Sequence, residues 1–133
     1  MSFLTTNSQV RLALVGISVV AITGGLGRFA YTPIIPYMQN TLNISSTDIG
    51  LIASSNYLGY LIGSIIPLIF SFANKQRLTL YLSVLVSIIT LGLMGLTSEF
   101  YTFVLLRFLQ GISGAIGLVI ATNVIFSQIT VTG

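Results

Sequence analysis

The sequence predicts an all-α membrane protein with four transmembrane helices, and three observations support this prediction. Of the 133 residues, 54% are hydrophobic and only 5% are charged, whereas about a quarter of the residues of a soluble domain are charged. The apolar stretches, which contain few charges, are long enough for helices of about twenty residues, which cross the hydrocarbon core of a bilayer. These stretches also lack the alternating polarity of β-barrel strands, which are about half as long.

Four apolar segments have the length of a transmembrane helix. They are residues 11–33, 49–70, 78–96 and 102–126. Pro33 and Pro36 stand at the end of the first segment. Because proline lacks a backbone donor, these two residues predict a break in the helix near the membrane face.

The second segment follows a polar run, residues 39–48, which predicts a loop. Ser46 or Thr47 is expected to cap the next helix, because a side-chain oxygen at that position accepts a hydrogen bond from a free amide of the first turn. Asp48 is then expected in that first turn, where the helix dipole favours a negative charge.

The charges outside the four segments predict the orientation of the chain. Arg11 stands at the very start of the first segment, and Lys75 and Arg77 lie between the second and the third. The other two loops carry only Asp48 and Glu99. Since basic residues of short loops stay on the cytoplasmic side, we expect both termini to be cytoplasmic and the loops with Asp48 and Glu99 to be external.

Several classes of function are excluded by residues that the sequence lacks. There is no Cys and no His, so zinc sites, thiol nucleophiles and Ser-His-Asp triads are ruled out, and we expect no metal and no cofactor. The two carboxylates stand far apart, which makes a paired-carboxylate enzyme implausible. The five basic residues are scattered singly, which argues against nucleic-acid binding. We therefore expect the chain not to be an enzyme.

Arg28 and Arg107 are the costliest residues, because both lie inside apolar segments. A charge at the middle of a span costs about 2.5 to 3.5 kcal/mol on insertion scales. Counting helical rise places both arginines in the outer half of the membrane. For Arg28, two interpretations stay open: it reaches the outer headgroups, or it has a function inside the bundle. For Arg107 we favour a buried, functional role. The candidate partners of both arginines are Asp48, backbone carbonyls, a helix outside this chain and an anionic solute.

Two stripes of small residues predict close helix packing, since they let another backbone approach. They are Ser55, Gly59 and Gly63 on the second segment and Gly111, Gly114 and Ala115 on the fourth. Beside the first stripe lie Asn56 and Tyr60, at the same four-residue spacing. A lipid-buried amide needs a partner, and the partner of Asn56 is either a neighbouring helix or a solute.

Residues 107–115 resemble the fourth-helix motif of the major facilitator superfamily of transporters. The matching pattern is an arginine, two further residues, a glutamine and a glycine, followed by small residues. Residues 25–36 and 55–63 are similar to a bacterial branch of that superfamily, the YbfB/YjiJ-like proteins. The loop of residues 71–77 departs from the superfamily, because it has neither the usual aspartate nor the usual glycine.

The resemblance implies secondary active transport of a small organic solute by alternating access. Arg107 would be the coupling residue, with Gln110 and Gly111 as its framework, and Arg28, Asn56 and Tyr60 would face the solute. The chain would lie in the bacterial cytoplasmic membrane. It would form the first three-helix repeat and one further helix of a twelve-helix transporter, as a fragment or a truncated form that packs on the remaining helices. An anionic solute is one candidate substrate.

Two other functions remain open at this stage. The first is a small four-helix exporter that dimerises, although such exporters usually carry an acidic residue in the first span, and this chain has none there. The second is a membrane subunit that transports nothing and packs on a partner through its small residues. The two arginines argue against the second, because helix packing alone does not need them.

Overall fold

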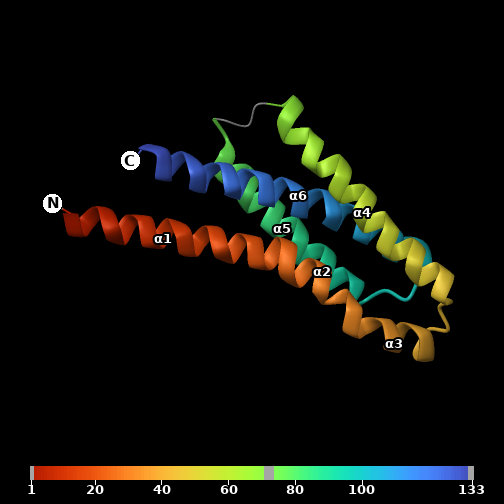
Figure 1. Ribbon diagram of the computed structural model, residues 1–133. Coiled ribbons are helices and arrows are strands. Elements are labelled where there is room, and N and C mark those ends of the chain that lie inside the picture. The colour runs from red at the N-terminus through yellow and green to blue at the C-terminus, as the bar shows by residue number, and fades with distance from the viewer. Residues whose placement is uncertain (1, 71–73, 132–133) are drawn as a thin grey trace.

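The computed structural model describes residues 2–70 and 74–131, and these form helices joined by short connections, with no strand among them. Figure 1 shows the long helices side by side in one elongated bundle. Four helical stretches have the length and hydropathy of a membrane span: Ala13–Thr41, Ser46–Ile69, Gln76–Met94 and Phe100–Ser127. Each overlaps one of the four predicted segments, so the predicted all-α fold with four spanning helices is confirmed.

The first span extends through four consecutive helical elements, the first of which begins before the span. They are α1 (Ser2–Val20), the π-helix η1 (Ala21–Leu26), α2 (Gly27–Phe29) and α3 (Tyr31–Thr41). The sequence predicted a break at Pro33 and Pro36. The helical elements instead continue to Thr41, and the interruption lies earlier, at Ala30. Pro33 lies in the first turn of α3, where a backbone donor has no intrahelical partner to lose. Pro36 lies inside α3 and does not end it.

Helix α4 (Ser46–Ile69) begins at Ser46, before the start that a cap at Ser46 or at Thr47 would give it. Ser45, and neither Ser46 nor Thr47, is the capping residue: its Oγ accepts a hydrogen bond from the Asp48 amide at 3.1 Å. The same hydroxyl donates to the Asp48 carboxylate at 2.7 Å. Asp48 lies in the first turn, as predicted, where its charge favours the helix start.

Helix α6 (Phe100–Val131) is the longest element and packs against α4 and against α5 (Gln76–Met94). On α6, the Oγ of Ser113 lies 3.0 Å from the Oγ of Ser87 on α5, and this buried hydrogen bond joins the two helices. Elements α1 and η1 also contact α6. The central position of α6 means that its side chains meet every other span.

Among the described residues outside the interior, basic and acidic side chains lie toward opposite ends of the bundle. Figure 1 shows both chain ends on one side and the connections 42–45 and 95–99 on the other. Arg11, Lys75 and Arg77 therefore lie toward the first side, the basic end, and Asp48 and Glu99 toward the second, the acidic end. Residues 71–73, part of the loop that departs from the superfamily pattern, lie outside the described residues.

Candidate functional site

Arg107 lies inside the bundle, with only 4% of its surface exposed. Its Nη1 donates to Oε1 of Gln110 at 3.0 Å, which follows from the helix, because residues three apart share a face. The guanidinium carbon lies 4.4 Å from the centre of the Tyr31 ring, a distance at which the ring face attracts a cation. Arg107 is thus enclosed by protein.

Tyr31 connects the first span to the start of α4. Its hydroxyl donates to the backbone carbonyl of Ile49 at 3.0 Å, and the residue is buried. That bond fixes the ring beneath the Arg107 guanidinium. Tyr31 was not among the site residues predicted from the sequence. The signal was its position three residues after Arg28, which places both on one helix face.

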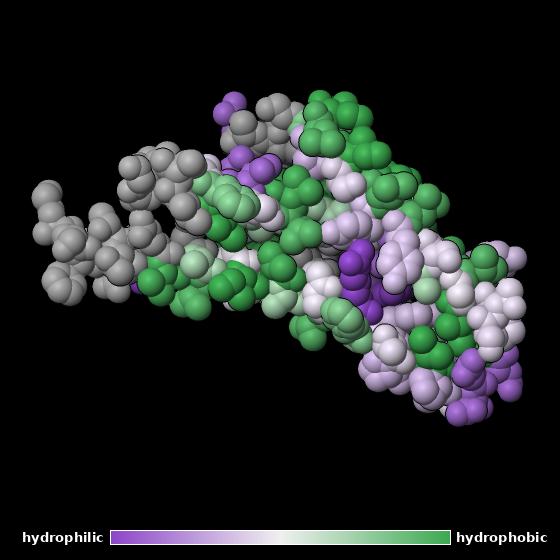
Figure 2. Space-filling model, in the orientation of Figure 1, coloured by the Kyte–Doolittle hydropathy of each residue, from purple (hydrophilic) through white to green (hydrophobic). Residues whose placement is uncertain are grey.

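Arg28, in α2, lies half-buried against two tyrosines of α4. Its guanidinium carbon is 4.3 Å from the centre of the Tyr60 ring and 5.6 Å from that of Tyr57. The structure therefore brings the predicted pair Arg28 and Tyr60 together, and adds Tyr57, which the sequence analysis missed. The Arg28 Nε is buried and has no hydrogen-bond partner among the described residues. Figure 2 shows a hydrophilic patch at mid-length beside α2 and α4, where most of the surface is apolar or neutral.

The two arginines belong to one group of side chains. Tyr31, whose ring meets the Arg107 guanidinium, lies three residues after Arg28 on the first span. The Asp48 carboxylate bonds to Ser45 at the acidic end, and Glu99 lies in the exposed 95–99 connection. Both carboxylates thus lie toward the acidic end of the bundle, and the two arginines lie between its two ends. We call this group the arginine–tyrosine cluster: Arg28, Tyr31, Tyr57, Tyr60 and Arg107.

Asn56 binds the backbone of α6 at the position of Arg107. Its Nδ2 donates to the backbone carbonyl of Arg107 at 2.9 Å, and only 3% of the residue is exposed. Of the two partners expected for this amide, the structure shows the neighbouring helix. Asn56 thus holds α6 beside α4 at the position of the arginine.

Small residues make the contact between α4 and α6 close. A Cβ added to Gly59 would overlap the carbonyl oxygen of Phe108, and one added to Gly111 would overlap that of Asn56. Gly63 faces α6 in the same way, one turn further along. We call this interface the glycine seam. Gly111 was expected in the framework of Arg107, and here it also packs.

The other predicted packing residues also lie on buried faces. Ser55 donates to the backbone carbonyl of Val104 on α6 at 3.1 Å. Ala115 is completely buried and would contact a Cβ at Gly63. Gly114 is buried as well. The residues of both stripes therefore lie in the interior of the bundle.

Gln110 joins the cluster through Arg107 but keeps one group unused. The residue is only 2% exposed, and its Nε2 has no hydrogen-bond partner among the described residues. A buried amide donor without a partner is costly.

One family of known proteins matches this chain. The family model described as "Uncharacterised MFS-type transporter YbfB" matches residues 19–133, a range that includes the whole arginine–tyrosine cluster and the glycine seam. No curated protein and no solved structure gives a significant match.

Proposed function

Because the chain belongs to the family of MFS-type transporters described by the name YbfB, we propose that it acts in secondary active transport of a small organic solute. One observation carries this proposal: the guanidinium group of Arg107, buried in the bundle, and that of Arg28, half-buried at its surface, each lie against a tyrosine ring. Charged residues within membrane spans are rare and mark solute or ion pathways.

The solute we propose is an anion. A guanidinium that stacks on a ring face keeps its in-plane N–H groups available for a carboxylate or a phosphate. Arg28 has such a group, its Nε, without a partner among the described residues. Tyr57 and Tyr60 provide aromatic faces beside it, so an organic anion with an aromatic body fits the chemistry of this surface.

In the proposed mechanism, Arg107 couples solute binding to the gradient and Gln110 and Gly111 hold it in place. The glycine seam and the Asn56 hydrogen bond join α4 and α6 closely at this level. These two helices therefore move together, and Arg107 keeps its position relative to α4. Alternating access then arises by rocking of this unit against other helices.

We further propose that the chain works with the remaining helices of a twelve-helix transporter in the bacterial cytoplasmic membrane. The proposed orientation places the basic end in the cytoplasm, because basic residues of short loops stay inside. Arg28, Asn56 and Tyr60 would then line the pathway, with Arg28 and Tyr60 in contact with the solute and Asn56 behind them.

The test is gradient-driven uptake by the transporter that contains this chain, in proteoliposomes, with phthalate as the probe because it is an aromatic dianion. We expect Arg107→Ala to abolish uptake driven by a proton gradient while membrane insertion stays normal. Arg77→Ala, at the basic end, removes the same charge outside the cluster and should leave uptake within about twofold. Unchanged uptake by the Arg107→Ala protein would contradict the assignment.

A further inference from the structure

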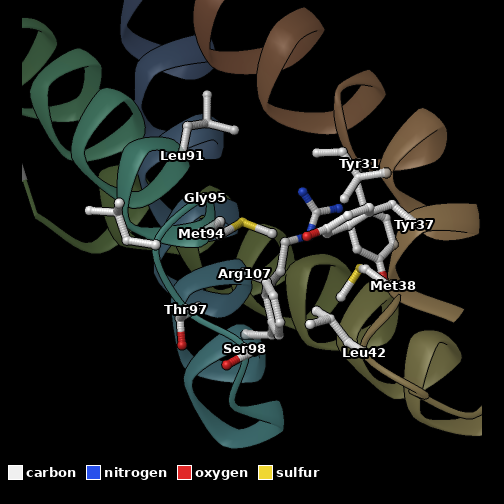
Figure 3. A pocket seen from close by; sticks show the side chains of 13 residues that line it. Tyr31, Tyr37, Met38, Leu42, Leu91, Met94, Gly95, Thr97, Ser98 and Arg107 are labelled. Atoms are coloured by element: carbon white, nitrogen blue, oxygen red, sulfur yellow. The ribbon is translucent and has the colours of Figure 1, made fainter. Parts of the chain in front are cut away.

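A cavity of about 290 Å³ opens between α3, α5 and α6 near the acidic end. Figure 3 shows the Arg107 side chain extending between Met94, on α5, and Tyr31 and Met38, on α3. Phe103, one turn before Arg107 on α6, forms another part of the wall. The cavity is separate from the surface where Arg28 meets Tyr57 and Tyr60, because none of these three residues lines it.

The wall of this cavity combines a single charge with apolar surface. Arg107 is the one charged residue that lines it, and most of the other lining residues are apolar. Thr97 and Ser98 also line it and belong to the connection between α5 and α6, so the cavity reaches the acidic end of the bundle. Binding sites for small molecules have this composition: apolar walls with a few convergent polar groups.

We propose that this cavity binds a small amphiphilic monoanion, an alkyl or aryl group that ends in a carboxylate or a sulfonate. Its anionic group lies at Arg107 and its apolar body lies against Met38, Met94 and Phe103. A monoanion matches this wall, because Arg107 is the one charged residue among those that line the cavity. The two flexible methionines adapt to apolar bodies of different shape.

The size of the cavity favours a small solute over a lipid. Its volume is near the lower end of the range for ligand pockets, which begins at about 300 Å³. The inference goes beyond the proposed function, because it requires binding and no movement of solute. If transport fails but binding is intact, the cavity inference therefore stands and the proposed function does not. If binding fails but transport is intact, the proposed function stands and the cavity inference does not.

The test is a titration of 6,6,6-trifluorohexanesulfonate into the full chain in phosphatidylcholine nanodiscs, followed by fluorine NMR with empty nanodiscs as the baseline. We expect saturable binding. Trifluoromethanesulfonate, which lacks the apolar body, and 6,6,6-trifluorohexanol, which lacks the charge, should each bind at least tenfold more weakly. Equal binding of the charged and uncharged probes would overturn the proposal.

Two variants test the two halves of the cavity separately. Arg107→Gln removes the charge, and Met94→Phe fills the apolar space without changing any charge. Each should weaken binding at least tenfold, while the controls Arg77→Gln and Leu82→Phe, at exposed positions, should change it less than twofold. Helicity measured by circular dichroism confirms that each variant folds. Unaltered binding by the folded Met94→Phe protein would refute the inference. Binding no greater than that of empty nanodiscs would also refute it, because a lipid chain or another helix would then fill the cavity.

Discussion

At the scale of single residues, the main result is how Arg107 is accommodated inside a membrane span. Insertion of an arginine costs about 2.5 to 3.5 kcal/mol. A hydrogen bond to a charged group contributes about 1.5 to 3 kcal/mol, and a desolvated cation–π contact about 2 kcal/mol. Gln110 and Tyr31 supply one of each. These two contacts together are of the size needed to offset the cost of insertion.

The Tyr31 side chain has two separable roles, which substitution can divide. Tyr31→Phe keeps the ring face beneath Arg107 and loses the hydroxyl that donates to Ile49. We expect this change to lower the free energy of unfolding by about 0.5 to 1.5 kcal/mol, measured by denaturation with SDS in mixed micelles. Tyr31→Leu also removes the cation–π contact and should destabilise the chain further. Equal effects of the two substitutions would show that the ring face does not hold the guanidinium.

At the scale of helices, the glycine seam determines how closely α4 and α6 approach. Gly59, Gly63 and Gly111 each place their Cα against a backbone carbonyl or amide of the other helix. Such close approach strengthens van der Waals packing, which drives helix association in membranes. The seam also brings the Asn56 amide to the Arg107 carbonyl. Helix packing and the position of the arginine therefore depend on the same residues.

Substitution of a seam glycine should be far more costly than that of an open one. We expect Gly59→Ala to lower the free energy of unfolding by about 1 to 3 kcal/mol, because the added methyl group forces the two backbones apart. Gly92→Ala is the matched control: a Cβ there meets nothing within 4 Å. It should be neutral or stabilising by up to about 1 kcal/mol, since alanine favours helix more than glycine does. Similar losses for both would contradict the close contact of the seam.

The sequence predicted the helices and the seam better than the cluster. Four-residue spacing identifies Gly59 and Gly63, because a helix places such residues on one face whatever surrounds it. The same local logic failed at Pro33, where proline fits the first turn of a helix that starts after Ala30. Tyr31 and Tyr57 were missed because their role depends on which helix lies opposite them. A local sequence pattern does not specify which helix lies opposite a given residue.

At the scale of the whole molecule, charge is sorted into three zones. Basic residues lie at one end and acidic residues at the other, and two arginines lie between them. The end charges bear on orientation through the preference of basic loops for the cytoplasm. The interior charges bear on function, because a cation in lipid requires a compensating partner.

The orientation can be tested directly, because the chain contains no cysteine and a single introduced thiol is unambiguous. We expect a thiol at Ser98, in the connection at the acidic end, to react with a membrane-impermeant maleimide added outside intact cells. A thiol at Asn74, near the basic end, should react only after the membrane is opened. The opposite pattern of labelling would reverse the proposed orientation.

The central claim is that two guanidinium groups lie within the membrane and meet an anionic solute there. Nitrogen-15 labelling of arginine in the chain, reconstituted in nanodiscs, gives separate side-chain NMR signals for Arg11, Arg28, Arg77 and Arg107. A water-soluble gadolinium chelate should broaden the signals of Arg11 and Arg77 and spare those of Arg28 and Arg107, and phthalate should shift only the latter pair. Equal broadening of all four signals would place both inner arginines in bulk water and contradict the account.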